Sequence, residues 1–185
     1  MHTENNRLRP AAFLDRDGVL IKDTGYAFQV DDLHVLPGVA DTLKELQKRG
    51  FLLIVISNQA GVARGYFSED DVKIFHQELS KQIEASSGAK IDAFYYCPHH
   101  PQGTVKSYAI ECDCRKPGTA LLKEAARAFH IDWEKSFFVG DRSSDIECAI
   151  NARIRGFQIF SDQYVMHENP HANIKALSDV LAYLP

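Results

Sequence analysis

The sequence predicts an α/β protein in which helices cover both faces of a parallel sheet, a three-layer Rossmann-like fold. Two observations lead to this class. Short apolar runs of strand length alternate along the chain with helical patterns, which is the order of βαβ units. The run from Phe51 to Ile56 is apolar at every position, as expected for a strand that is buried on both faces of a parallel sheet.

Five short segments, most of them apolar, are expected to form the strands. They are residues 11–14, 51–56, 91–96, 136–139 and 156–160. The first strand is followed directly by Asp15 and the second by Ser57, so polar residues mark where each apolar run ends.

Five helices are expected between and after these strands. They are residues 39–48, a helix that begins after Ser68 and extends to about Ile83, and residues 119–129, 144–152 and 174–184. In the first helix, Val39, Leu43 and Leu46 share one face. Ser68 is a suitable N-cap, and the three acidic residues that follow it lie in the first turn, where they suit the helix dipole.

The composition is that of an ordinary globular protein and excludes several classes. Among 185 residues, 45% are apolar and 25% are charged. The longest apolar run is far shorter than the ~20 residues of a membrane span, and residues 1–10 are polar and show no secretory signal. We therefore expect a cytoplasmic monomer without a membrane partner. The net charge of −4 counts against a nucleic-acid partner.

Polar or metal-binding side chains follow four of the expected strands directly. In a doubly wound sheet, ligands bind beyond the carboxyl ends of the strands. The segments at these positions are residues 15–18, 57–59, 97–100 and 140–142. Because the four segments meet at one edge of the sheet, we expect them to form one site.

The first of these segments contains Asp15 and Asp17, and this pair has three interpretations. The carboxylates can bind Mg²⁺, which prefers oxygen ligands. They can divide the roles of nucleophile and general acid/base. They can also belong to a solvated loop. A third carboxylate at Asp141 would complete an Mg²⁺ site, and the hydroxyl of Ser57 and the ammonium of Lys116 are groups that phosphoryl transfer needs.

A second cluster consists of three cysteines and a histidine. Cys97-x-His99 and Cys112-x-Cys114 supply three sulfurs and one imidazole, a set that suits tetrahedral Zn²⁺ in a closed, structural site. Buried free thiols or a single disulfide are the alternatives. Zinc would fix the loop of residues 97–114, which leads directly to Lys116. Cys148 is expected to be a small core residue, and His100 is expected to lie on the loop surface.

Taken in order, these motifs resemble those of the haloacid-dehalogenase-like phosphatase superfamily. The matching segments are residues 13–20, Ser57, Lys116 and Gly140-Asp141 with Asp145, which span most of the chain. The resemblance implies that Asp15 attacks phosphorus and forms an aspartyl-phosphate, with Asp17 as general acid and base. It also implies that Mg²⁺ is held by Asp15, the backbone carbonyl of Asp17 and Asp141, while Ser57 and Lys116 hold the phosphoryl oxygens.

Within the superfamily, the zinc loop and residues 57–65 resemble the heptose bisphosphate phosphatases. These enzymes remove the 7-phosphate of D-glycero-D-manno-heptose 1,7-bisphosphate in nucleotide-activated heptose biosynthesis, which supplies lipopolysaccharide or surface-layer glycan. The related histidinol-phosphate phosphatases resemble the chain less, because residues 101–111 form a long insert. By this resemblance, the small phosphorylated sugar is contacted by Asp23, Thr24, Gly25, Tyr26, Ser57, Asn58, Gln59, Ala60, Arg115, Lys116 and Arg142.

The sequence departs from this family at two places. Pro117 is followed by Gly118-Thr119 where a second proline is common, and Arg142 stands where a lysine is common. Arg142 keeps the cationic charge but has the fork geometry of a guanidinium. These departures leave the phosphatase prediction intact and concern the identity of the sugar.

We also expect one domain over residues 1–185, because the intervals between Asp17, Ser57 and Lys116 leave no room for a cap domain of ~100 residues. Specificity would then come from loops, and Arg64, Arg115 and Arg142 could bind a second phosphate or be solvated surface.

Three alternative functions remain. One is a phosphatase for another small monoester, such as histidinol phosphate. Another is a nucleic-acid 3′-phosphatase, which has related motifs but is disfavoured by the charge. The third is a non-catalytic zinc-dependent binding module, disfavoured by the presence of both Asp15 and Asp17.

Overall fold

The protein, described here from a computed structural model, is placed over residues 8–185; most of the polar N-terminal segment therefore lies outside the described residues. Six strands form one sheet in the order β3-β2-β1-β4-β5-β6. All five neighbouring pairs are parallel. The strands are β1 (Ala11–Leu14), β2 (Leu52–Asn58), β3 (Ala93–Cys97), β4 (Phe137–Gly140), β5 (Arg155–Ile159) and β6 (Ala172–Ile174).

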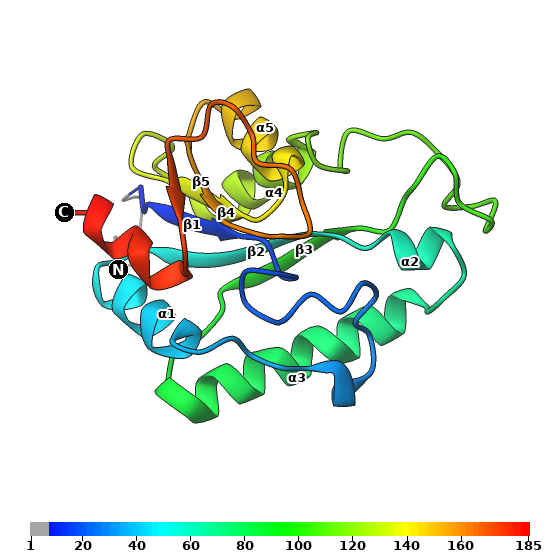
Figure 1. The fold of residues 1–185 in the computed structure, drawn as a ribbon, viewed down its shortest axis with the longest axis horizontal. Helices are drawn as coiled ribbons and strands as arrows, with labels where there is room; N and C mark the ends of the chain where they lie inside the picture. Colours follow the sequence, from blue (N-terminus) through cyan, green and yellow to red (C-terminus); the bar gives the residue numbers. More distant parts are fainter. Residues whose placement is uncertain (1–7) are drawn as a thin grey trace, which may run out of the picture.

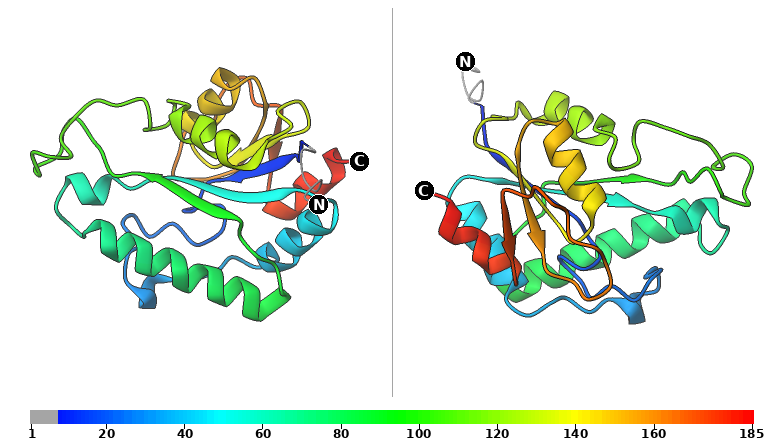
Figure 2. Two further views of the ribbon diagram at one scale, coloured as in Figure 1. Left: turned by 180° about the vertical axis from the view of Figure 1, so that it is seen from behind. Right: turned by 45° about the horizontal axis from the view of Figure 1, so that its top comes forward.

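The helices cover both faces of this sheet, so the predicted three-layer α/β fold is confirmed. In Figure 1, α4 and α5 lie above the sheet and α1 and α3 lie below it, and the two views of Figure 2 show the same layers. The helical elements are η1 (Val30–Asp32), α1 (Val39–Lys48), α2 (Ala60–Ala63), α3 (Glu69–Ser87), α4 (Ala120–Phe129), α5 (Ser143–Asn151) and η2 (Leu177–Tyr183).

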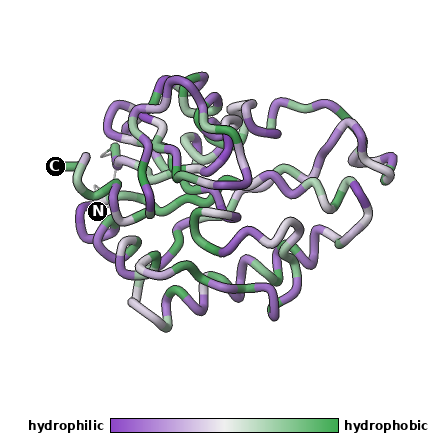
Figure 3. The backbone as a smooth tube through the Cα atoms, viewed as in Figure 1, coloured by the Kyte–Doolittle hydropathy of each residue, from purple (hydrophilic) through white to green (hydrophobic). Residues whose placement is uncertain are grey.

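The central strand β1 explains why the strands are apolar throughout. Ala12 and Leu14 belong to the core under α1 and α3, whereas Ala11 and Phe13 belong to the core under α4 and α5. Successive side chains point to opposite faces of a sheet, and both faces are covered here. Figure 3 shows the resulting hydrophobic strands inside a largely hydrophilic exterior.

The predicted N-cap of the long helix α3 is present. The hydroxyl of Ser68 accepts a hydrogen bond from the Asp71 backbone N–H at 3.2 Å, and the Asp71 carboxylate accepts one from the Ser68 N–H at 2.7 Å. This reciprocal capping box satisfies two amides that the first turn leaves free. Gly88 follows the helix with φ of +71°, a left-handed conformation that glycine adopts without strain.

The predicted C-terminal helix over residues 174–184 is confirmed only in part, as a 3₁₀ helix over Leu177–Tyr183. Residues 172–174 form the edge strand β6, which pairs with β5, and a short 3₁₀ helix begins only at Leu177. The Asp179 carboxylate accepts hydrogen bonds from the backbone N–H groups of Lys175 and Ala176 at 2.9 and 3.2 Å, which sets the start of this helix. The start of the predicted helix is therefore part of a strand, because Ile174 pairs with β5.

The two chain segments that join β1 to β2 and β2 to β3 contain few secondary-structure elements. The chain between β1 and β2 holds η1 and α1, and the chain between β2 and β3 holds α2 and α3. Within residues 8–185, neither connection forms a cap domain. A long loop runs from β3 to α4 and extends beyond the sheet near α2 (Figures 1 and 2). None of the helices described is both long and apolar enough to cross a membrane.

Candidate active site

A crevice of about 330 Å³ lies at the carboxyl ends of the central strands, where the polar segments were expected to meet. Ten of the residues that the sequence predicts as catalytic or substrate-binding line it: Asp15, Asp17, Gly25, Tyr26, Asn58, Gln59, Ala60, Arg115, Lys116 and Arg142. Four predicted residues, Asp23, Thr24, Ser57 and Asp141, are not in the crevice lining. Asp141 and Ser57 are buried, Asp23 is half-buried, and Thr24 is exposed.

Lys116 lies at the base of the crevice between two buried carboxylates. Its Nζ is 2.6 Å from Asp15 Oδ1 and 2.7 Å from Asp145 Oδ1, and it also donates to the carbonyl of Ile56 at 3.0 Å. Burial alone would lower the pKa of Lys116, but the carboxylates of Asp145 and Asp15 outweigh it and raise that pKa. Lys116 is therefore a permanent cation beside Asp15.

Asp141 completes a group of three carboxylates that one lysine does not neutralise. Oxygens of Asp15, Asp141 and Asp145 all lie within 4.8 Å of one another. Asp141 Oδ1 is buried without a hydrogen-bond partner, and burial together with Asp15 and Asp145 raises the pKa of Asp141 to about 8. An unpaired buried carboxylate oxygen in an oxygen-rich cluster fits a hard divalent cation such as Mg²⁺.

Gly18 lets the first loop approach this cluster. Its φ is +79°, and a Cβ at this position would collide with the carboxylate of Asp141. A side chain here would force the two loops apart, so glycine is required for both its conformation and its size.

The Asp17 carboxylate is held by a buried arginine. Nε and Nη2 of Arg16 donate to the two carboxylate oxygens of Asp17 at 3.1 and 3.0 Å, and Gln59 Nε2 lies 3.3 Å from Oδ2. Burial raises the pKa of Asp17, and Arg16 opposes this shift only in part. A carboxyl group with a raised pKa is suited to give and take protons.

Ser57 and Asn58 have structural contacts at the end of β2. Ser57 Oγ accepts a hydrogen bond from Gln59 Nε2 at 2.6 Å. Asn58 Oδ1 accepts from the backbone N–H of Lys116 at 3.0 Å, and its Nδ2 donates to the Lys116 carbonyl at 3.2 Å. The Asn58 side chain therefore fixes the main chain of the lysine against β2.

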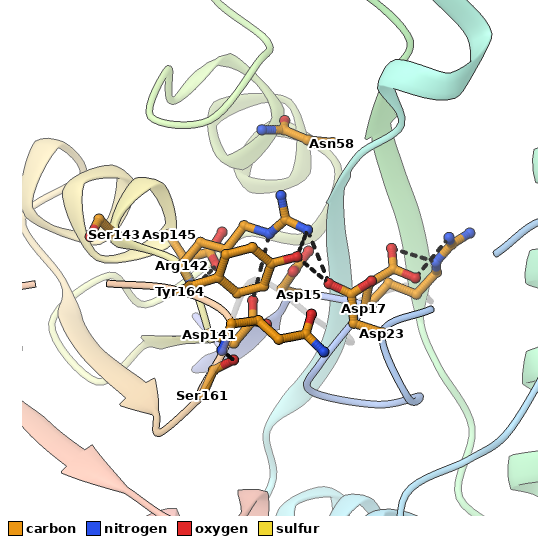
Figure 4. Close-up of polar contacts among 12 residues, drawn as sticks. Asp15, Asp17, Asp23, Asn58, Asp141, Arg142, Ser143, Asp145, Ser161 and Tyr164 are labelled. Atoms are coloured by element: carbon orange, nitrogen blue, oxygen red, sulfur yellow. Dashed lines mark hydrogen bonds and ion pairs between the residues drawn. The ribbon is translucent and has the colours of Figure 1, made fainter. Parts of the chain in front are cut away.

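Arg142 and Asp23 contact each other and Tyr164, as Figure 4 shows. Arg142 Nη2 lies 3.1 Å from Asp23 Oδ2. Burial alone would raise the pKa of Asp23, but the hydrogen bonds from the Tyr164 hydroxyl and the Gly25 N–H and the charge of Arg142 together lower it. Asp23 is thus an anion that joins the loop after β1 to the turn after β4.

The four predicted zinc ligands come together where the two ends of the long loop meet. Cys114 Sγ lies 3.0 Å from Cys97 Sγ and 3.2 Å from Cys112 Sγ, and His99 Nδ1 lies 3.3 Å from Cys114 Sγ. Within the described part of the chain all four cysteines are free thiols, so the disulfide alternative is not observed. The donor set fits one tetrahedral Zn²⁺. Cys148 is buried in the core under α4 and α5, as predicted.

Two residues of the crevice wall, His100 and Tyr164, were not predicted from the sequence to belong to the site. His100 was expected on the loop surface, but it lines the crevice together with Arg64 and Arg115, because its backbone N–H donates to the carbonyl of Tyr108 at 3.1 Å and folds the insert back. Tyr164 also lines the crevice and was not predicted. Its loop, residues 160–171, carries neither a periodic pattern nor a recognised motif.

The parallel sheet, the crevice and its aspartates define the class: this is a haloacid-dehalogenase-like phosphatase. The family model for polynucleotide kinase 3 phosphatase matches residues 10–174. The chain is 42% identical over 150 residues to D-glycero-β-D-manno-heptose-1,7-bisphosphate 7-phosphatase of Rhodopseudomonas palustris, which covers 81% of this chain and 83% of the relative. It is 41% identical to the Escherichia coli K12 protein of the same name over 78% of this chain and 75% of the relative.

A solved structure agrees with these sequence matches. The structure of D,D-heptose 1,7-bisphosphate phosphatase from B. bronchiseptica, complexed with magnesium and phosphate, superposes with a TM-score of 0.79 at 25% identity and covers 94% of this chain and 97% of that chain. The chain belongs to the polynucleotide kinase 3 phosphatase family and, within it, to the group of D-glycero-β-D-manno-heptose-1,7-bisphosphate 7-phosphatases. The prediction of a phosphoric monoester hydrolase is thereby confirmed.

Proposed function

We propose that the protein hydrolyses the 7-phosphate of D-glycero-β-D-manno-heptose 1,7-bisphosphate, in a Mg²⁺-dependent reaction that serves nucleotide-activated heptose biosynthesis. The observation that carries the proposal is the position of Lys116. Its Nζ is 2.6 Å from Asp15 Oδ1 in a crevice that three arginines line. A nucleophilic carboxylate beside a buried cation, with further cations around it, suits a substrate that carries two phosphates.

In the first step, an oxygen of Asp15 attacks the phosphorus of the 7-phosphate. The bond between phosphorus and the sugar oxygen breaks, and Asp17 gives its proton to that oxygen. The products are the sugar alcohol and an aspartyl-phosphate on Asp15. Lys116 offsets the charge of the phosphoryl oxygens during the transfer. The Ser57 hydroxyl, which accepts a hydrogen bond from Gln59, is proposed to donate its own proton to a phosphoryl oxygen.

In the second step, water hydrolyses the aspartyl-phosphate. Asp17, now ionised, removes a proton from the attacking water, whose oxygen forms a bond to phosphorus as the bond to Asp15 breaks. Inorganic phosphate leaves, Asp15 is restored as a carboxylate, and Asp17 is again protonated. Arg16 holds Asp17 through two hydrogen bonds in the structure, which favours the same position in both steps.

The two metals have separate proposed roles. Asp15, the backbone carbonyl of Asp17 and Asp141 would hold Mg²⁺, which when bound offsets the repulsion between the Asp15 carboxylate and the anionic substrate. Cys97, His99, Cys112 and Cys114 would hold a structural Zn²⁺ that shapes the loop of residues 97–114. The substrate contacts are proposed to come from residues 23–26, 57–60, 115–116 and 142.

A substrate panel tests this proposal. Steady-state kinetics on the β and α anomers of the heptose bisphosphate, histidinol phosphate and several sugar monophosphates should give the highest kcat/KM for the β anomer. The Asp15→Asn variant, purified in the same way, controls for contaminating phosphatases. A higher kcat/KM for any other ester would overturn the assignment and favour the small-monoester alternative.

The family match supports a second candidate function, a nucleic-acid 3′-phosphatase, because the matching family is described as polynucleotide kinase 3 phosphatase. Three arginines in the crevice wall could contact a nucleic-acid backbone. The net charge of −4 opposes such binding, since nucleic-acid affinity depends on neutralised phosphates. Release of phosphate from a 3′-phosphorylated oligonucleotide, compared with the heptose bisphosphate in one assay, separates the two.

We also propose that residues 1–185 act as one domain and that the protein is a cytoplasmic monomer. Light scattering on the purified chain measures the oligomeric state.

A further inference from the structure

Tyr164 lies outside every motif that defines the site, yet it closes a hydrogen-bonded triangle in the crevice wall. Its hydroxyl donates to Asp23 Oδ2 at 2.6 Å and accepts from Arg142 Nη2 at 2.6 Å. The same Nη2 also donates to Asp23 Oδ2 at 3.1 Å. Figure 4 shows the three side chains, which come from loops after β1, β4 and β5. In this triangle the guanidinium only donates, the carboxylate only accepts, and the hydroxyl does both, as the chemistry of each group allows.

The loop that carries Tyr164 is attached to the turn after β4. Ser143 Oγ donates to the carbonyl of Val165 at 3.0 Å. The fully buried Gln158 accepts from the His167 backbone N–H at 2.7 Å and donates to the Asp141 carbonyl at 3.1 Å. The loop and the turn that bears Asp141 and Arg142 are thus held together by hydrogen bonds on either side of Tyr164, which fixes the place of its ring.

The tyrosine holds Arg142 by its ring as well as by its hydroxyl. The guanidinium carbon lies 4.1 Å from the ring centroid, within cation–π range. The Arg142 side chain is still 43% exposed, and within residues 8–185 its Nε and Nη1 groups donate no hydrogen bond. Nε lies 4.0 Å from Asp141 Oδ1, so an arginine fixed in this way presents chiefly its Nη1 group to a ligand, without first losing rotamer freedom.

We propose that Tyr164 is a specificity-determining positioning residue, which together with Asp23 fixes Arg142 as a cation that binds an anionic phosphate oxygen of the substrate. This inference rests on the proposed function, because the substrate must bring a phosphate to Arg142. Tyr164 acts through Arg142 and touches no reacting atom. Its effect therefore belongs to substrate binding, which KM measures, and not to the chemical steps at Asp15.

The Tyr164→Phe variant removes only the hydroxyl and keeps the ring. KM for the heptose bisphosphate should rise roughly five- to tenfold, the size expected for the net contribution of one hydrogen bond, and kcat should stay within about twofold. Tyr95→Phe is the matched control: Tyr95 packs against the core on β3, and its hydroxyl makes no hydrogen bond to a described residue. Its KM should be unchanged.

A double-mutant cycle with Arg142→Met separates positioning from a general structural role. If Tyr164 acts through Arg142, Tyr164→Phe changes KM in the native background and adds nothing when Arg142 is methionine. Where the double variant is too slow to assay, calorimetric affinity for inorganic phosphate is compared across the same four proteins. An unchanged KM in Tyr164→Phe, or an equal effect in both backgrounds, overturns the proposal.

The test of Tyr164 can be told apart from the test of the proposed function. If the native protein prefers another phosphate ester, the proposed function fails, and the same cycle is run on the preferred ester. If the native protein prefers the heptose bisphosphate but Tyr164→Phe leaves its KM unchanged, only the role of Tyr164 fails.

Discussion

At the scale of single residues, the site is a balance of buried charges. Lys116 faces the carboxylates of Asp15 and Asp145. Within residues 8–185, Asp141 Oδ1 has no hydrogen-bond partner and only a long ion pair of 4.0 Å with Arg142 Nε. Removing one member of such a group leaves the others uncompensated. The energies of these charged groups therefore depend on one another, and a substitution at one of them also changes the energy of the charges that remain.

Replacing the proposed nucleophile tests the chemistry without changing the shape of the side chain. Asp15→Asn should lower kcat by at least about a thousandfold, because an amide does not form the acyl phosphate. The fold should persist, since Lys116 keeps its contact with Asp145 at 2.7 Å. Phosphate release and circular dichroism measure the two effects. Near-native turnover would exclude Asp15 as the nucleophile.

His76 links pH to stability at a distance from the crevice. It is buried and stacks on Phe94, its Nε2 has no hydrogen-bond partner, and burial with the nearby Arg16 lowers its pKa to about 3. The unfolded chain keeps a histidine pKa of about 6.5. Between these values the unfolded state binds more protons, so the free energy of unfolding falls as the pH drops below about 6.5, by about 1.4 kcal/mol per pH unit.

The His76→Phe variant should therefore lose less stability in acid than the native protein does. Between pH 7 and pH 5, urea unfolding should show a decrease smaller by roughly 2 kcal/mol. The exposed His34 provides the control, since His34→Gln should keep the native pH dependence. Identical pH dependence for His76→Phe and the native protein would contradict this account.

At the scale of elements, side-chain contacts add to the backbone hydrogen bonds that organise the loop between β3 and α4. The ligand cluster holds its base, and Glu69 of α3 holds its insert. The Glu69 carboxylate accepts hydrogen bonds from the Tyr108 hydroxyl and from the Tyr96 hydroxyl, both at 2.7 Å. These two bonds lower the pKa of Glu69, which keeps it an anion near the loop.

The metal content of this loop is directly measurable. A chain purified without chelators should carry about one zinc, since three thiolates and an imidazole make a closed site. Cys112→Ser should lose most of it, whereas Cys148→Ser, which alters a core thiol, should retain it. Elemental analysis decides the matter, and a native chain free of zinc would refute the assignment.

Glu69 should control the order of the insert. Glu69→Ala removes the acceptor of two hydrogen bonds, so amide exchange over residues 101–111 should become faster by roughly a factor of ten, about 1.4 kcal/mol of local stability. Asp70→Ala is the control, because it removes an exposed acid from the same turn without contact to the insert. Equal exchange in the two variants would show that Glu69 does not hold the loop.

Sequence reasoning succeeded where a pattern reflects the contacts of its own segment. The bounds of α1 match the prediction because its apolar face is regular, and β2 was recognised because both faces of the sheet are covered. The strand β6 was missed because it is three residues long and only Ile174 is buried. Tyr164 was missed for a related reason, since its role comes from Asp23 and Arg142, which are distant in sequence.

At the scale of the whole molecule, an acidic protein gathers cations at one opening. The chain carries a net charge of −4, while Arg64, Arg115 and Arg142 line the crevice with Lys116. Such an arrangement attracts an anionic substrate locally although the protein as a whole is negative. The site predicted from the sequence motifs thus lies where the topology of the sheet brings four loops together.

Mg²⁺ should stabilise the whole fold, because it would offset carboxylates that Lys116 leaves uncompensated. At a concentration 100 times its Kd, a ligand that binds only the folded state adds about 2.7 kcal/mol to the free energy of unfolding. Thermal melts with and without MgCl₂ should show a higher Tm with the metal. Asp141→Asn should abolish most of the difference, and a native Tm indifferent to Mg²⁺ would argue against this cation site.

The two hydrogen bonds between Asn58 and the main chain of Lys116 have a consequence for how such enzymes diversify. Cys97 ends β3 and is buried, and Lys116 is fastened to β2, so the segment between them has both of its ends fixed by the sheet. Lengthening a loop with fixed ends costs little free energy. The insert of residues 101–111 can therefore be exchanged for one of another length, and a new substrate selected, while Lys116 stays in place.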